Sequence, residues 1–141
     1  MIRRSFITRS LGLAIAFSGG CAGGVPPLNP SPVPLGIWGG DHVTMTIAAT
    51  GTHVELDCAH GDFSGVLSTD ARNQFSVAGT FVREHGGPVR ADQAPDIRPA
   101  IFAGSLQANS MALTIRLSDT DDLIGSFSLA RGAQGRIVKC L

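Results

Sequence analysis

The sequence contains little that would identify an enzyme or a nucleic-acid-binding protein. It has no tyrosine, one tryptophan and few charges, since Asp, Glu, Lys and Arg make up 16% of its residues. No basic run occurs, which excludes the electrostatic surface that nucleic-acid-binding proteins use. Apolar residues of helix-length periodicity are few, and the 18 glycines further disfavour a helical bundle. The chain contains no nucleophile elbow, catalytic triad or phosphate loop, so we expect no catalytic residue and no cofactor.

The first 20 residues have the layout of a bacterial export signal. Arg3, Arg4 and Arg9 form a basic head, residues 11–17 are an apolar run, and small residues follow at 18–20. The apolar run is too short for a permanent membrane-spanning helix, which needs about 20 apolar residues. We therefore assign residues 1–20 to targeting and exclude them from the fold.

Two short motifs in this segment resemble known export signals. Arg3-Arg4-Ser5-Phe6-Ile7 is similar to the core of a twin-arginine signal, although these arginines would equally serve an ordinary secretory signal. Ser18-Gly19-Gly20-Cys21 resembles a lipobox, although a large aliphatic residue is expected where Ser18 stands. The resemblance implies cleavage before Cys21 and a lipid on that cysteine. Ala22 then implies the periplasmic face of the outer membrane. The alternative is a soluble periplasmic or secreted protein.

The three cysteines, Cys21, Cys58 and Cys140, fit this interpretation. An odd number of cysteines in an exported chain leaves one thiol to explain. If Cys21 carries lipid, Cys58 and Cys140 are free to pair in an oxidising compartment. The alternative pairing, from Cys21 to either of the others, would tie a tail to the core. We therefore predict a lipid on Cys21 and a Cys58–Cys140 disulfide.

The rest of the chain divides into a tether, residues 21–34, and one domain, residues 35–141. The tether is rich in Pro and Gly, and a Pro-rich chain is extended at about 3.1 Å per residue. The domain is long enough for a single modest core. Three of the eleven basic residues lie in the signal, so cleavage leaves eight basic against eleven acidic residues, a net charge of about −3.

Alternating apolar and polar residues predict an all-β domain. The clearest element is a hairpin over residues 42–58, with a turn at Thr50-Gly51. We expect residue 47 to face 54, 45 to face 56, and 43 to face 58. This register places every apolar side chain of the hairpin, and the Cys58 side chain, on the core-facing surface.

Further short strands follow at close spacing. They are predicted at residues 63–68, 74–78, 80–83, 100–107, 111–118, 123–130 and 136–140. This pattern favours a small antiparallel meander barrel of about eight strands, or a two-sheet sandwich. Gly36-Ile37-Trp38 resembles the Gly-x-Trp opening of lipocalins and avidins, which implies an eight-stranded barrel with the Trp closing one end. Closure would place the last strand beside the first ones, and a Cys58–Cys140 bond would join the second strand of the domain to its last.

Two groups of polar residues are candidates for a site. His42, His53 and His60 lie near Glu55 and Asp57 in the sequence, but their spacing matches no known zinc signature. The expected register also places His42 and His53 near opposite ends of the hairpin. We therefore predict an ordinary polar strand face and no metal site.

The second group belongs to the long irregular segment at residues 84–99. Long loops in compact domains are usually functional or disordered. With Arg83, His85, Arg90 and Arg98, this segment is either a binding loop over a barrel mouth or a solvated connection between strands.

These observations predict a non-enzymatic binding or interaction module, tethered to the bacterial envelope by lipid, with an unknown protein or small-molecule partner. The alternative is a structural or inhibitory envelope protein that contacts another protein and binds no small molecule. A hollow barrel would favour a small ligand, and a filled one would favour protein contact. We expect a filled interior.

Overall fold

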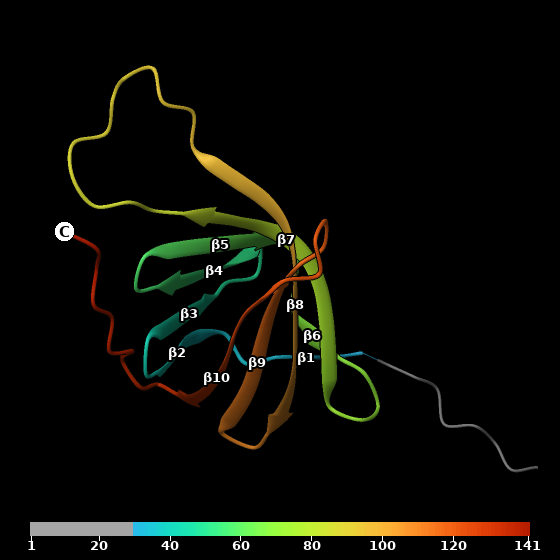
Figure 1. Ribbon diagram of the computed structural model, residues 1–141. Coiled ribbons are helices and arrows are strands. Elements are labelled where there is room, and N and C mark those ends of the chain that lie inside the picture. Colours follow the sequence, from blue (N-terminus) through green and yellow to red (C-terminus); the bar gives the residue numbers. More distant parts are fainter. Residues whose placement is uncertain (1–29) are drawn as a thin grey trace, which may run out of the picture.

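The computed structural model describes residues 30–141, so the predicted signal, Cys21 and most of the tether lie outside the described residues. Residues 30–141 form an antiparallel β-barrel (Figure 1). Eight strands close the barrel in the order β10-β2-β3-β4-β5-β7-β8-β9. The predicted all-β class and eight-stranded barrel are therefore confirmed. Within this part of the chain, no helix is long and apolar enough to cross a membrane.

Most neighbouring strands of the barrel are also neighbours in the sequence, as expected of a meander. The barrel strands are β2 (Gly36–Gly40), β3 (Val43–Ile47), β4 (Gly51–Leu56), β5 (Ala59–Ser64), β7 (Gln74–Arg83), β8 (Asp96–Gln107), β9 (Ser110–Leu117) and β10 (Leu123–Arg131). A separate two-stranded sheet pairs β1 (Ser31–Pro32) with β6 (Ser68–Thr69). Since β1 belongs to the predicted tether and Val33 is buried, the packed domain begins before residue 35.

The barrel has two different ends. The β2–β3, β4–β5 and β9–β10 turns and the long β7–β8 loop, residues 84–95, lie at one end. The C-terminal residues 133–141 run along this end, and we call them the strap and this end the strap end. The β3–β4 and β8–β9 turns lie at the opposite end with β1, where the described chain begins (Figure 1). We call that end the N-terminal end.

Apolar side chains fill the barrel interior. The Phe102 ring lies against Gly61 and Gly79. A Cβ on Gly61 would collide with this ring, and a Cβ on Gly79 would collide with Asp62 and Phe63 and press against the ring. The Phe63 ring packs beside Phe102, with ring centroids 5.2 Å apart. The largest fully buried apolar side chains are those of Trp38, Phe102, Met45, Leu67, Leu113, Ile115, Val33, Val43 and Val54.

The first hairpin forms, but its predicted register is wrong by two residues. Residue 43 faces 56, 45 faces 54, and 47 faces 52. The turn spans residues 48–50 and is closed by a 2.9 Å hydrogen bond from the Ala48 N–H to the Gly51 carbonyl. A shift of two residues keeps every side chain on its predicted face, because side chains alternate with period two. It moves Cys58 out of the strand and into the β4–β5 turn.

Four other predicted strands also differ from the structure. The segments 74–78 and 80–83 form one strand, β7, which passes through Gly79 without a break. The strand predicted at 63–68 is β5, which begins at Ala59 and ends at Ser64. The segment 136–140 is no strand and belongs to the strap, in which Arg136 makes an isolated bridge with Asp41. Its polar contacts go to turns and to the ends of strands, and it pairs with no neighbouring strand of the described barrel along its length.

Candidate functional site

The strap connects three chain segments at the strap end of the barrel. At the β2–β3 turn, the Arg136 N–H donates to the Gly40 carbonyl at 3.0 Å, and the His42 N–H donates to the Arg136 carbonyl at 2.9 Å. The Val138 N–H donates to Asp57 Oδ1 at 2.9 Å in the β4–β5 turn. The last residue, Leu141, lies against Gly86 in the β7–β8 loop. The strap is therefore a structural part of this end.

Two glycines let the strap lie close to the barrel. A Cβ on Gly39 of β2 would collide with the strap backbone at Ala133 and Gly135, and a Cβ on Gly135 would collide with Val43. A side chain at either glycine would hold the strap away from the sheet. Gly39, which follows Trp38, therefore has a packing role that nothing in the sequence alone indicated.

Cys58 and Cys140 lie at disulfide distance, with Cα atoms 5.3 Å apart. This separation lies within the range of natural disulfides. The pairing predicted from the cysteine count therefore agrees with the structure. The predicted location is wrong, because the bond joins a turn to the strap rather than one strand to another.

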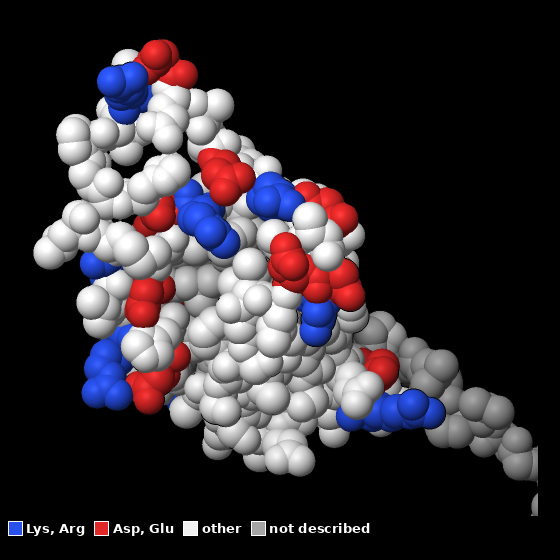
Figure 2. Space-filling model, viewed as in Figure 1, with Lys and Arg blue, Asp and Glu red and all other residues white. Residues whose placement is uncertain are grey.

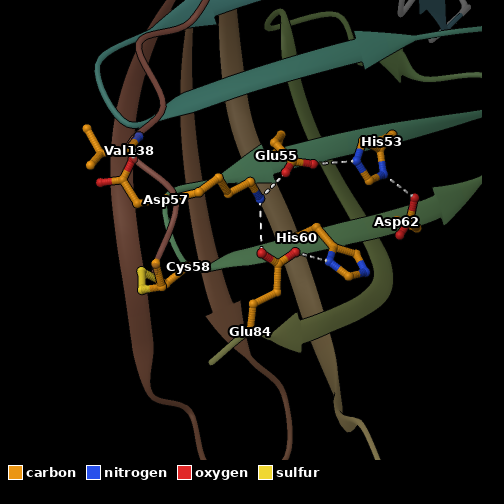
Figure 3. A network of polar contacts seen from close by, with 10 residues as sticks. His53, Glu55, Asp57, Cys58, His60, Asp62, Glu84 and Val138 are labelled. Atoms are coloured by element: carbon orange, nitrogen blue, oxygen red, sulfur yellow. Dashed lines mark hydrogen bonds and ion pairs between the residues drawn. A yellow bond between two sulfur atoms is a disulfide. The ribbon is translucent and has the colours of Figure 1, made fainter. Parts of the chain in front are cut away.

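A network of charged groups surrounds the disulfide on the outer surface of β4 and β5. The Lys139 ammonium contacts Glu55 and lies 3.0 Å from Glu84 Oε2. Glu55 in turn contacts His53 at 2.8 Å, and Glu84 contacts His60 at 2.7 Å (Figure 3). One lysine of the strap thus connects two acidic residues, one from β4 and one from the start of the β7–β8 loop.

These contacts shift the acidities of the groups. The hydrogen bond from the Val138 N–H is the main cause of a lowered pKa at Asp57. The pKa of Glu84 is lowered mainly by His60 and then by Lys139. Burial opposes the shift at Glu55, but hydrogen bonds from Lys139 and His53 outweigh it and lower the pKa. All three carboxylates therefore stay charged at neutral pH.

The histidines do not converge on one point. His42 Nδ1 pairs with Asp57 at 2.6 Å, whereas His53 Nδ1 pairs with Asp62 at 2.7 Å. Cross-strand pairing explains the second contact, because His53 faces Asp62 on β5. Over residues 30–141, no three His, Cys, Asp or Glu side chains are arranged to hold a metal ion. That this face binds no metal stays a prediction.

A hollow of about 360 Å³ opens at the strap end, and we call it the mouth hollow. Its apolar lining comes from β4, β5, β7 and β10, and its polar lining comes from turns and strand ends at the same end. The apolar side chains are those of Leu56, Ala59, Phe81, Ile124 and Phe127. The polar ones are those of His42, Asp57, Arg83 and Glu84, with Cys58 beside them.

A larger hollow, of about 630 Å³, lies over the outer surface of β3, β4, β5 and β7. Small and polar side chains line most of it, including Ala48, Ala78 and Thr80. The mouth hollow is smaller, but it combines an apolar lining with charged groups and a nearby disulfide. Binding sites typically have this composition, so we take the mouth hollow as the candidate site.

The structure separates the four predicted loop residues. Arg83 is the last residue of β7 and lines the mouth hollow. Arg98 lies in β8 and forms an ion pair with Asp119, with an N–O distance of 2.7 Å. His85 and Arg90 belong to the loop itself. The predicted irregular segment thus ends at residue 95, and only Arg83 of the four lines the candidate site.

No family model, curated protein or solved structure matches the chain.

Proposed function

We propose that the protein is a non-catalytic interaction module of the bacterial envelope, and that a protein partner contacts its strap end. The distribution of exposed apolar side chains carries this proposal. Of the seven large exposed ones among residues 30–141, five lie at the strap end: Val89, Ile97, Leu123, Val138 and Leu141. The other two, Leu35 and Val66, lie at the N-terminal end. Exposed apolar surface bordered by charged groups is typical of protein contact sites.

The path of the chain also favours the strap end as the contact surface. The described chain enters the barrel at the N-terminal end, and the strap and β7–β8 loop lie at the other (Figure 1). A domain held by its N-terminal segment therefore has its strap end free to meet a partner. The predicted lipid on Cys21 would provide this attachment at the membrane.

The filled barrel favours a protein partner over a small ligand. Trp38, Phe102 and Ile115 are fully buried in the interior, where a hollow barrel would hold its ligand. The mouth hollow supports a small apolar ligand as a second candidate, because its volume lies within the usual range of ligand pockets. It also accepts a side chain of a protein partner, so it agrees with both.

Site-specific photocrosslinking in producing cells tests the proposal. A photoreactive amino acid would replace Val89 in the loop or Val138 in the strap, which are 70% and 63% exposed. Val66, 58% exposed at the N-terminal end, is the matched control. We expect the same discrete crosslinked protein from the first two positions and none from the third.

Crosslinking from Val66 alone would place the contact at the wrong end and contradict the proposal. The absence of a crosslinked protein at both strap-end positions, together with a small molecule released from the purified protein on denaturation, would favour the second candidate.

A further inference from the structure

We propose that the strap-end half of β10 binds an extended peptide segment of the partner, which adds to the barrel as a further strand. This inference rests on the proposed function and specifies how the partner is recognised. Strand addition needs a free strand edge with unpaired backbone groups, and a place for the side chains of the added segment. Both lie together at the mouth hollow.

The free edge results from the short closure of the barrel. β10 pairs with β9 from Leu123 to Ala130. On its other edge it pairs with β2 through two residues alone, Ala130 with Gly39 and Arg131 with Trp38. Because β2 ends at Gly40, no strand of the described barrel pairs with β10 on this edge between residues 123 and 128.

Three contacts show which backbone groups face the free edge. The Arg131 N–H donates to Asn109, on the β9 side, at 2.9 Å. The Gly132 N–H donates to Ile37, on the β2 side, at 2.7 Å, and the Ser128 carbonyl lies against Gly40 on that side. Even-numbered residues therefore point their N–H and C=O groups away from β9, because these groups alternate along an antiparallel strand. The pairing is regular from residue 125 to 130, so Ser126 presents both groups to the free edge.

The mouth hollow adjoins this edge. Ile124 and Phe127 of β10 form one side of the hollow, and Leu56 and Phe81 belong to strands across it. Alternate side chains of a strand point to opposite faces of a sheet. A strand added beside Ser126 would therefore direct one of its side chains inward, to the apolar lining. An apolar side chain fits that position best.

The charge of the strap end favours a basic segment. Most of the charged side chains on the visible face lie toward this end (Figure 2). Nine acidic residues lie here: Asp41, Glu55, Asp57, Glu84, Asp92, Asp96, Asp119, Asp121 and Asp122. Six basic residues accompany them: Arg83, Arg90, Arg98, Arg116, Arg136 and Lys139. The occupant we infer is thus an extended peptide with an apolar residue in the hollow and Lys or Arg beside it.

A random dodecapeptide library displayed on phage, selected against the purified oxidised protein, provides the probe. The test variant is Ser126→Pro, which removes the N–H at the free edge and no hydrogen bond to β9. The matched control is Ser126→Ala, which removes the hydroxyl contact with Thr114 but keeps the N–H. We expect selected peptides to lose about tenfold in affinity on the proline variant and to keep it on the alanine variant.

A second measurement leaves the protein unchanged. Selected peptides are synthesised with N-methyl groups at alternate residues, in the two possible phases. An added strand turns alternate N–H groups toward its neighbour, so one phase should abolish binding and the other should retain it. This result decides the proposal even if Ser126→Pro fails to fold.

Equal binding of both methylated phases, or peptides that bind at the β7–β8 loop, would overturn strand addition. Failure to select any peptide would also overturn it. The proposed function would survive each of these results if Val89 and Val138 still crosslink a partner, and would fail with the inference if they do not.

Discussion

Asp57 uses both of its carboxylate oxygens, one to hold the strap and one to hold the β2–β3 turn. Its Oδ1 accepts the Val138 N–H at 2.9 Å, and its Oδ2 lies 2.6 Å from His42 Nδ1. One residue in the β4–β5 turn thus fixes the strap and the side chain of the neighbouring turn. Because Cys58 follows directly, this contact also positions the strap for the disulfide.

We predict that the strap loosens at low pH. Asp57 and Glu84 have a lowered pKa in the folded protein, so their contribution to stability is present above the unfolded pKa and lost as pH falls through the folded one. The window is therefore below about pH 4. Hydrogen exchange, corrected for the intrinsic rate, should show that the Val138 amide loses protection several-fold from about pH 6 to about pH 3.

Two controls separate this effect from general unfolding. The amide of Ile115, in the core strand β9, should keep its protection over the same range. Asp57→Ala should expose the Val138 amide already at neutral pH. The pKa of His53 is raised in the folded protein, so its contribution to stability is lost as pH rises and not as pH falls. His53 therefore does not explain a loss of protection in acid. An unchanged Val138 amide in acid would show that Asp57 does not hold the strap.

At the scale of the element, the disulfide is the covalent link between the strap and the barrel. We predict that replacing both Cys58 and Cys140 by Ser lowers the free energy of unfolding by about 2–4 kcal/mol, because the bond closes a long loop of the unfolded chain. The two cysteines are 82 residues apart in the sequence. Denaturant unfolding of the oxidised protein and the double variant measures the difference.

The double variant avoids leaving a single reactive thiol. Non-reducing peptide mapping of the native protein should recover the peptides of Cys58 and Cys140 joined. Free thiols at both positions in the exported protein would contradict the bond, and so would an unfolding free energy that the double substitution leaves unchanged.

The elements that the sequence predicted best are those with one buried and one exposed face. Strands β3, β4 and β9 alternate strictly, and the faces predicted for the first hairpin, β3 and β4, are confirmed. Alternation does not determine register, because a shift of two residues leaves the same faces buried. The first hairpin was therefore predicted with the correct faces and the wrong turn.

The strap and the small sheet could not be predicted in the same way. Each strand of the small sheet, β1 and β6, is two residues long and carries no periodicity. The strap contains the β-branched residues Ile137 and Val138, which favour a strand. Ion pairs and hydrogen bonds to turns and strand ends hold it instead, and these depend on where those elements meet in space. The candidate site was found in part, since Arg83 and Cys58 line the mouth hollow, whereas Ile124 and Phe127 were predicted only as part of a strand.

At the scale of the whole molecule, the two ends of the barrel would separate the proposed attachment from the proposed contact. The chain enters at the N-terminal end beside β6, and the strap, the loop and the mouth hollow occupy the opposite end. The predicted lipid anchor and the proposed partner would therefore not compete for the same surface. The predicted cleavage and lipidation of the N-terminus would therefore leave the strap end free for the proposed partner.

The last prediction is that the mature chain begins at Cys21 and carries lipid there. Cys58 and Cys140 lie at disulfide distance, so neither is left to pair with Cys21. The lipobox-like residues before Cys21 imply that its thiol is acylated instead. Mass spectrometry of protein from the native membrane fraction should show an acylated N-terminal cysteine. Cys21→Ala should move the protein to the soluble fraction and, by releasing the barrel from the membrane, reduce crosslinking from Val89 to a membrane-bound partner. An intact Met1, or a soluble native form that begins after Cys21, would refute the anchor and leave the barrel free to diffuse to its partner.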